Sequence, residues 1–338
     1  MDSVLVTGGA GFVGLNLVEA LLARGEHVVV FGREAAFPDD AARDFAALPG
    51  RVLVVQGDVQ DAGALRAVFR DHRCRAVFPF AAITAGPARE AASPGLVLDT
   101  NLGGVIRTLE AARDAGTVRR VVLPSSAAVY GESAYAFAEL DEVTTPCMPI
   151  SLYGVTKYAV ERGGLRLAAL WGLDAVAARI GATFGPWERD TGVRDTLSPH
   201  LGIARAALMG GTAVLPGAPL PSYDWVYARD LAAGLLALLD AQTPPHRAVN
   251  LASGLDWAPS AMPCCAVFEH AFTGFTARHA ATGETPNIIF QDTKPRGVMK
   301  LARAADFGWQ PRFPPVAAYQ DYAEWLLRHR ASVKAATG

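Results

Sequence analysis

The stretch VLVTGGAGFVGLNLVEALLA, residues 4–23, decides the expected fold. It begins with an apolar run typical of a buried β-strand, passes through the glycine-rich turn TGGAGFVG (7–14), and continues as a helical pattern from residue 12. Glycines at such a junction permit a tight turn and a close approach of the backbone to a pyrophosphate, which the N–H groups at the helix N-terminus can then hold. The motif alone is weak evidence, but the strand before it and the helix after it are the context that nucleotide binding requires. We therefore predict that this turn binds a nucleotide.

The first half of the chain continues with the same alternation of strands and helices. Continuous apolar strands that alternate with helices indicate a parallel sheet covered on both faces. We predict a Rossmann-type doubly wound α/β domain. The expected strands after the first are 27–32, 51–58, 75–82 and 118–126, and the expected helices are 12–24, 61–72 and one that begins at about Ser93.

The regular alternation of strands and helices ends at about residue 182. Segments rich in glycine and proline follow, with one clear helix at 228–240 and a strand-like run at 248–254. These features predict a smaller C-terminal α/β substrate domain that packs on the first. The expected division is 1–181 plus about 224–254 for the dinucleotide-binding domain, and about 182–223 plus 255–338 for the substrate-binding domain.

Composition limits the classes of partner. The chain has 338 residues and a formal net charge of −2, with both signs of charge spread along it, which argues against a nucleic acid or an anionic membrane surface. The four cysteines lack CxxC spacing and the seven histidines lack HxH or HExxH spacing, so neither a zinc site nor a disulfide framework is predicted. The sequence passes directly into a strand without a signal-peptide pattern, and its apolar stretches are too short to span a bilayer. We expect a soluble, cytoplasmic protein that acts on a small molecule.

A second motif, YGVTK at 153–157, places a tyrosine and a lysine four residues apart on one face of an expected helix. The ammonium of Lys157 can then lie near the phenol of Tyr153 and lower its pKa, which would otherwise be near ~10. A phenolate of this kind could remove a hydroxyl proton as hydride leaves the carbon.

With these motifs the chain resembles the extended short-chain dehydrogenases/reductases, the subgroup typified by NAD-dependent sugar epimerases and dehydratases. The resemblance covers nearly the whole chain but does not identify the substrate. The matching segments are TGGAGFVG (7–14), GDVQD (57–61), FAA (80–82), DTNLGG (99–104), SSAAVYG (125–131), YGVTK (153–157), RIGATFGP (179–186), DWVYARDLA (224–232), NLASG (250–254) and FGWQP (307–311).

The resemblance implies roles for particular residues. Ser126 would hydrogen-bond the reacting oxygen, Tyr153 would be the acid/base, and Lys157 would tune Tyr153 and hold the cofactor ribose. Asn101 would hold a proton-relay water or only hydrogen-bond the backbone, Ser125 would be structural, and Thr84 would join the substrate site. The expected cofactor-binding residues are Gly8, Gly11, Phe12, Val13, Gly14, Arg33, Asp58, Val59, Ala81, Ala82, Tyr153 and Lys157.

Two alanines reduce the number of reactions that the chain is expected to catalyse. In the resembled 4,6-dehydratases an Asp-Glu pair follows the catalytic Ser or Thr, and in the sugar-acid decarboxylases a Glu occupies the second position. This chain has Ala127 and Ala128 there. Because a methyl group cannot transfer a proton, both reactions are disfavoured. Net oxidation or reduction, or an epimerisation that oxidises and reduces again, remains.

The second expected strand departs from the NAD pattern. An acidic residue normally ends this strand and binds the adenosine ribose, but here Gly32 ends it and Arg33 follows. An adjacent guanidinium can bind a 2′-phosphate. The alternative is that Arg33 is a bystander and Glu34 supplies the acid, although an acid shifted by two residues should point elsewhere. We predict NADP, with NAD possible.

The substrate prediction rests on two further departures. UDP-sugar enzymes of the resembled subgroup commonly carry an Asn and an Arg that hold the substrate pyrophosphate, where this chain has Ala182 and Tyr223. Lys294 or Arg296 could compensate. The segment WERDTGVRD (187–195) offers Arg189 and Arg194, which could bind one carboxylate or lie in a solvated loop.

Three functions stay open. The first is an oxidoreductase for a small non-nucleotide polyol, sugar or sugar acid, which we predict. The alternatives are a nucleotide-sugar (UDP-sugar) 4-epimerase and a non-catalytic NADPH-binding regulator. The expected helices at 94–115 and 152–170 carry apolar residues on more than one face. In the resembled family they pair across a two-fold axis, so a homodimer is expected.

Overall fold

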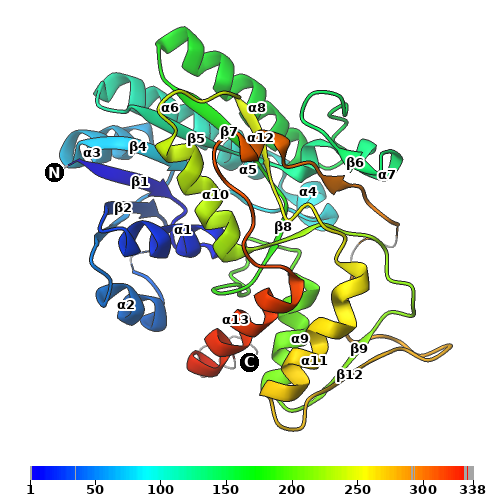
Figure 1. Cartoon of the computed structure of the whole chain (residues 1–338). Coiled ribbons are helices and arrows are strands. Elements are labelled where there is room, and N and C mark those ends of the chain that lie inside the picture. Colours follow the sequence, from blue (N-terminus) through cyan, green and yellow to red (C-terminus); the bar gives the residue numbers. More distant parts are fainter. Residues whose placement is uncertain (1, 35, 291, 293, 331–332, 334–338) are drawn as a thin grey trace.

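The computed structural model describes residues 2–34, 36–290, 292, 294–330 and 333. Seven parallel strands of this part of the chain form one central sheet, and sequence-adjacent strands are joined by helices as the alternating pattern predicted (Figure 1). The order across the sheet is β11 (Ala248–Leu251), β7 (Ala175–Ile180), β5 (Arg120–Ser126), β4 (Cys74–Pro79), β1 (Ser3–Thr7), β2 (His27–Gly32) and β3 (Arg51–Gln56). The prediction of a Rossmann-type α/β fold is confirmed.

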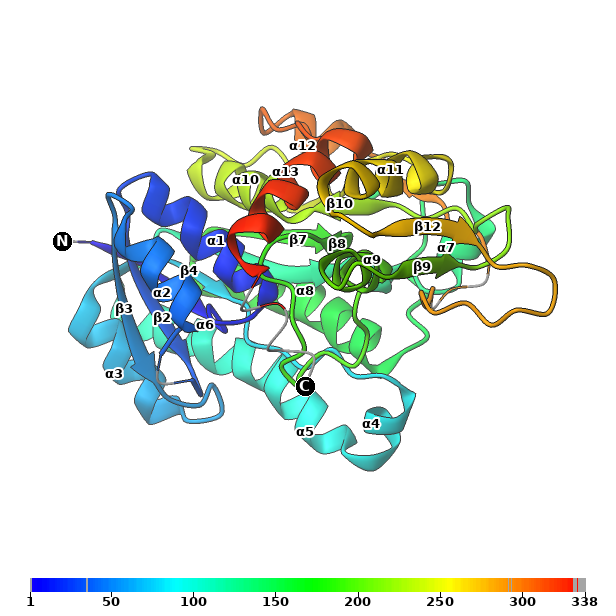
Figure 2. The same ribbon diagram turned by 90° about the horizontal axis from the view of Figure 1, so that it is seen from below.

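Helices cover both faces of this sheet, which explains why its central strands are apolar throughout (Figures 1 and 2). All five residues of β1 and all seven of β5 are buried. One face carries α1 (Phe12–Ala23) and α10 (Ala228–Asp240), and the other carries α3 (Ala62–His72), α6 (Gly104–Ala115) and α8 (Leu152–Trp171). A short helix that the sequence did not predict, α2 (Asp39–Ala46), lies beside α1.

The chain reverses its direction across the sheet at β1, which pairs with β2 on one side and β4 on the other. Ligands of doubly wound sheets bind in the crevice at the carboxyl ends of the strands at this point. The turn between β1 and α1 lies there and depends on its glycines. Gly8 has a φ of +67°, and a Cβ on it would lie 2.7 Å from Ala81 Cα. A Cβ on Gly14 would lie 2.4 Å from the Gly8 carbonyl oxygen.

The helix expected from about Ser93 is present and runs without a break from Pro94 to Ala115, as α5 (Pro94–Leu98), a single π-helical turn η1 (Asp99–Gly103) and α6. A separate short helix, α4 (Pro87–Ala92), precedes it. Isolated π turns inside α-helices occur frequently at functional sites. This one contains Asn101.

The remaining elements lie mainly at the carboxyl end of the sheet and form three two-stranded parallel pairs with short helices around them. The pairs are β6 (Glu139–Leu140) with β13 (Val298–Met299), β8 (Ala182–Phe184) with β10 (Trp225–Tyr227), and β9 (Thr212–Leu215) with β12 (Thr276–His279). The helices are η2 (Ala127–Val129), α7 (Ser133–Ala136), α9 (Pro199–Leu208), η3 (Ala258–Ser260), α11 (Ala261–Ala271), α12 (Ala302–Ala305) and α13 (Pro315–Arg328).

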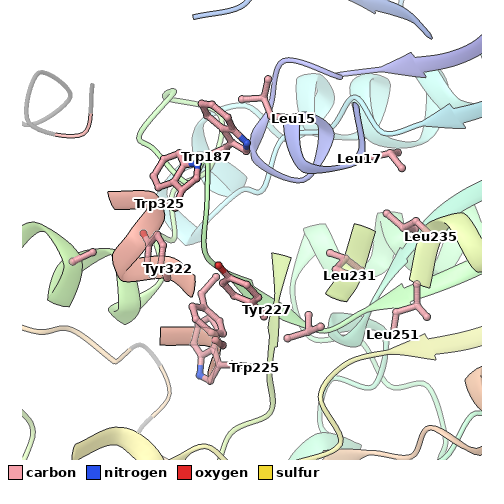
Figure 3. Close-up of a cluster of buried hydrophobic side chains, with 14 of the residues drawn as sticks. Leu15, Leu17, Trp187, Trp225, Tyr227, Leu231, Leu235, Leu251, Tyr322 and Trp325 are labelled. Atoms are coloured by element: carbon pink, nitrogen blue, oxygen red, sulfur yellow. The ribbon is translucent and has the colours of Figure 1, made fainter. Parts of the chain in front are cut away.

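One apolar core joins these elements to the Rossmann part. Figure 3 shows Leu231 and Leu235 of α10 on one side of Tyr227 and Tyr322 and Trp325 of α13 on the other, with Leu15 of α1 beside Trp187. The shared core fixes how the second part sits over the crevice. The domain boundaries given above stay a prediction.

Among the described residues, none of the helices is both long and apolar enough to cross a membrane. Within the same ranges, no group of three or more His, Cys, Asp and Glu side chains is arranged to hold a metal ion.

Candidate active site

A cavity of about 570 Å³ runs from the glycine turn across the carboxyl ends of the strands. It brings together residues from both halves of the chain. Every predicted site residue except Asn101 lines it: Gly8, Gly11, Phe12, Val13, Gly14, Arg33, Asp58, Val59, Ala81, Ala82, Thr84, Ser126, Tyr153, Lys157, Arg189 and Arg194.

The glycine turn fits a dinucleotide. Since side chains at Gly8 and Gly14 would collide with the backbone, the turn can only close as it does with glycine there. The backbone N–H groups at the beginning of α1 follow directly, which gives a pyrophosphate both close approach and donors. Thr7 adds support, because its Oγ1 accepts a hydrogen bond from Ala81 N at 3.1 Å and ties the turn to the segment after β4.

Tyr153 and Lys157 lie in the first turns of α8, whose beginning is fixed by two side chains. Ser151 caps the helix, its Oγ accepting a hydrogen bond from Gly154 N at 3.0 Å. Glu90 Oε1 accepts a bond from Tyr153 N at 3.2 Å. The Lys157 Nζ lies 5.5 Å from the centroid of the Tyr153 ring, so the two side chains share one helix face as the spacing predicted.

Ser126 ends β5 and faces the same cavity. Its Oγ accepts a hydrogen bond from Ala128 N at 3.2 Å. The neighbouring Ser125 also lines the cavity, but its hydroxyl donates to the buried Glu161 carboxylate at 2.7 Å.

The environment of Tyr153 acts on its acidity in two opposite ways. Burial raises the pKa of the Tyr153 phenol above its ordinary value, and the hydroxyl of Ser126, the charge of Arg194 and the hydroxyl of Thr84 offset part of that rise. Arg194 is thus a cation that favours the phenolate and that the sequence did not indicate for this role, while the tuning role of Lys157 stays a prediction. Burial lowers the pKa of Lys157 itself to about 8.

Asn101 is buried beside the cavity without lining it. Its Oδ1 accepts a hydrogen bond from Ile83 N at 2.7 Å, and its Nδ2 donates to Ile83 O at 2.9 Å and Thr156 Oγ1 at 3.2 Å. These contacts match the alternative in which Asn101 holds the backbone. The relay-water role stays a prediction.

The adenosine end of the cavity differs from the expectation. A Cβ on Gly32 would lie 3.1 Å from Glu34 Oε2, so the carboxylate of Glu34 returns to the place where an acidic residue 32 would begin. An acid two residues later was expected to point elsewhere, which is wrong, because β2 ends at Gly32 and strand geometry no longer applies to Glu34. Arg33 also lines the cavity. A carboxylate in this place can accept bonds from ribose hydroxyls and repels a 2′-phosphate.

The two arginines of the segment 187–195 lie at different sites. Arg189 Nη2 donates to the carbonyl oxygen of Ala10 at 3.0 Å, which places it on the glycine turn and away from the substrate end. Arg194 pairs with the buried Glu188 at 2.9 Å, and its guanidinium lies 5.3 Å from the Phe12 ring centroid. Of these two arginines, Arg194 is the one whose charge acts on Tyr153, and the substrate-binding role of both stays a prediction.

The far end of the cavity contains a polar cluster that sequence reasoning found only in part. Arg296 Nη1 donates to Tyr223 Oη at 2.9 Å and to Asp292 Oδ2 at 3.0 Å. Tyr135 Oη donates to Asp292 Oδ1 at 2.7 Å, and the Arg296 guanidinium lies 5.4 Å from the ring centroid of Tyr135 and 5.1 Å from that of Tyr223. Tyr135 and Asp292 carried no sequence signal except the four-residue spacing of Asp292 and Arg296.

Comparisons with known proteins agree with this geometry. A family model described as "NAD dependent epimerase/dehydratase family" matches residues 4–252. UDP-glucose 4-epimerase of Erwinia amylovora is 30% identical over 81% of this chain and 84% of its own length. UDP-glucuronate 4-epimerase 2 of Arabidopsis thaliana is 31% identical over 70% of this chain, which spans about half (54%) of that protein. The structure of MoeE5 in complex with UDP-glucose and NAD is 26% identical, with a TM-score of 0.74 over 97% of this chain and 99% of that one.

Proposed function

The chain belongs to the NAD-dependent epimerase/dehydratase family, and from this premise we propose that it is an NAD-dependent nucleotide-sugar 4-epimerase. The observation that carries the proposal is the extent of one cavity. The cavity runs from the glycine turn and Glu34, past Ser126, Tyr153 and Lys157, to Tyr223 and Arg296. A nucleotide cofactor and a long substrate can therefore meet at Tyr153.

The residues at the meeting point can perform a reversible oxidation. Tyr153 takes the proton of a secondary hydroxyl, and the Ser126 hydroxyl donates a hydrogen bond to the same oxygen. When bound, NAD supplies the acceptor and later the donor of hydride. Lys157 would hold the cofactor ribose. Tyr153 would return its proton to the same oxygen when hydride is returned to the opposite face of that carbon, so the configuration would be inverted without net redox change.

The cofactor prediction changes with the structure. Glu34 beside Gly32 supports NAD over the NADP that Arg33 suggested. Arg189 lies at the glycine turn and adds a positive charge near the pyrophosphate.

Arg194 supports an acidic sugar within this class. Its guanidinium lies in the cavity near the phenol of Tyr153 and is held by the buried Glu188. A carboxylate on the carbon chain next to the reacting position would meet it. UDP-glucuronate is therefore a preferred candidate, and the UDP-glucuronate 4-epimerases among the relatives are consistent with it.

A second candidate is an oxidoreductase for a non-nucleotide sugar or sugar acid. Ala182 and Tyr223 line the cavity where the resembled UDP-sugar enzymes carry an Asn and an Arg. Arg296 is also partly neutralised by Asp292. The cavity therefore offers a substrate diphosphate less positive charge than the cavities of those enzymes do.

One experiment separates the candidates. The purified protein is loaded with NAD and incubated with UDP-glucuronate, UDP-glucose and free glucuronate, and products are followed by proton NMR together with nicotinamide absorbance. The epimerase gives a C4 epimer of a UDP-sugar at constant absorbance. The oxidoreductase gives a stoichiometric absorbance change with the free sugar acid, and a non-catalytic regulator gives neither.

The homodimer also stays a proposal. Leu96 and Leu98 on α5 and Val155 and Leu170 on α8 are exposed by 40 to 58%, which supports pairing of this helical face with a second copy. Light scattering coupled to size exclusion measures the mass directly.

A further inference from the structure

The two groups that would act on the reacting oxygen come from different elements. Tyr153 lies on α8, and Ser126 ends β5. Acid–base chemistry requires both oxygens to reach the same substrate atom, and a displacement of about 1 Å can cost on the order of 10²-fold in rate. The position of α8 along β5 therefore matters for catalysis.

Apolar packing brings α8 close to β5 but does little to fix the position of the helix along the strand. Gly164 of α8 lies against Leu123, where a Cβ would meet Leu123 Cδ1 at 2.8 Å, and Gly154 lies against the carbonyl oxygen of Ala128. Small residues of this kind allow close approach. They do not by themselves prevent the helix from shifting along the strand.

A buried ion pair at the next turns of α8 forms directional bonds that can fix the position of this helix along β5. Glu161 is 1% exposed and lies four residues after Lys157 on the sheet-facing side of the helix. Its Oε2 accepts bonds from Ser125 Oγ at 2.7 Å and Arg179 Nε at 2.9 Å, and its Oε1 accepts from Arg179 Nη2 at 2.7 Å. Ser125 is the residue next to Ser126, so one carboxylate joins the catalytic helix to the catalytic strand.

Hydrogen bonds continue from the Glu161–Arg179 pair to the β6–β13 pair. Arg179 of β7 donates through Nη1 to Tyr130 Oη at 3.0 Å, and its guanidinium lies 5.0 Å from the Tyr130 ring centroid. Tyr130 Oη donates to Asn250 Oδ1 at 2.8 Å. Asn250 Nδ2 in turn donates to the carbonyl oxygens of Leu140, the last residue of β6, and Lys300, the residue after β13.

We propose that Glu161 is a positioning residue for the reaction: through Ser125 and Arg179 it fixes the register of α8 on β5, so that Tyr153 and Ser126 face one substrate oxygen. A buried ion pair is weak evidence for stability, since apolar residues of similar volume often stabilise a protein equally well. Its directional, bidentate bonds fix geometry in a way that apolar contacts do not. The inference rests on the acid–base role of Tyr153 in the proposed function.

The test compares Glu161→Gln, Ser125→Ala and the double variant Glu161→Met/Arg179→Met with the wild type. The double variant removes both charges and refills the volume, so it separates stability from positioning. We expect it to unfold at a temperature close to that of the wild type and to bind NAD normally, while kcat per folded site falls about 10-fold or more. Glu161→Gln should lower kcat in the same direction. If both variants fold and keep kcat within two-fold of the wild type, the inference is wrong.

A second readout requires no substrate. The titration of Tyr153 is followed by NMR of ring-labelled tyrosine and assigned with Tyr153→Phe. Removing the negative charge of Glu161 should by itself lower the pKa of Tyr153, whereas displacing α8 from Ser126 and Arg194 should raise it. A raised pKa of Tyr153 in Glu161→Gln supports positioning, and an unchanged or lowered one contradicts it. Absence of turnover in the wild type on every sugar would overturn the proposed function but would leave this titration decisive. Ser125→Ala removes one bond to Glu161 and should lower kcat in the same direction as Glu161→Gln. Should the double variant fail to fold, the kcat of these two variants and the titration of Tyr153 still decide the question.

Discussion

The carboxylate of Glu34 lies 3.1 Å from the position that a Cβ on Gly32 would occupy. A carboxylate at the end of the second strand is the group that takes the adenosine ribose hydroxyls in doubly wound dinucleotide-binding domains. The structure therefore provides the acidic group that the sequence pattern lacks at residue 32.

The first prediction concerns this carboxylate. Glu34→Gln keeps the shape of the side chain but removes its charge, so NAD affinity should fall by about 1.5–3 kcal/mol, the scale of a hydrogen bond to a charged group. NADP affinity should rise or stay constant, because repulsion of the 2′-phosphate is lost. Arg33→Ala is the matched control and should leave NAD binding nearly unchanged. Calorimetric titration measures all three, and a native preference for NADP that depends on Arg33 would contradict the prediction.

The second prediction concerns the acid/base. Tyr153→Phe keeps the packing but removes the titrating oxygen, so turnover should fall by at least ~10²-fold while NAD affinity barely changes. Tyr158→Phe, on the same helix, is the control and should keep turnover close to that of the wild type. Near-normal turnover in Tyr153→Phe would exclude Tyr153 as the base.

The third prediction concerns Lys157 and pH. Burial lowers the pKa of Lys157 to about 8 in the folded protein, below its value in the unfolded chain. Between these two pKa values the unfolded state binds more protons, so this group makes the free energy of unfolding rise with pH, by at most about 1.4 kcal/mol per pH unit. Denaturant unfolding of the cofactor-free protein at pH 7.5, 9 and 10 measures the effect. The difference between the wild type and Lys157→Met should become more favourable to the wild type as pH rises, and a flat difference would disagree.

The fourth prediction concerns the far end of the cavity. If Arg296 binds a substrate phosphate, Arg296→Ala should weaken UDP binding by about 1.5–3 kcal/mol and leave NAD binding intact. The exposed Lys294 provides the control, since Lys294→Ala should change UDP affinity little. Equal losses in the two variants would show that neither residue forms a specific phosphate site.

Local patterns predicted the parts of the structure that depend on short segments. The apolar run before Gly8 and the helical period after Phe12 were enough for β1 and α1, and the four-residue spacing of Tyr153 and Lys157 was enough for their shared helix face. Each of these features is set by residues a few positions apart.

Features that depend on the path of loops were not predictable in the same way. The return of Glu34 to Gly32 depends on how the chain leaves β2, and the contact of Arg189 with Ala10 joins segments 179 residues apart. The cluster of Tyr135, Asp292 and Arg296 assembles only when the C-terminal segment packs beside α7. No local period encodes such contacts.

The most direct test of the account is the fate of a UDP-sugar on the NAD-loaded wild-type protein. We predict that UDP-glucuronate, and more slowly UDP-glucose, is converted to an equilibrium mixture with its C4 epimer, detected by proton NMR, while nicotinamide absorbance stays constant over the whole reaction. If UDP does not bind at micromolar concentration and no epimer forms, while a free sugar acid reduces NAD stoichiometrically, the chain is an oxidoreductase for a non-nucleotide substrate and the central claim is wrong.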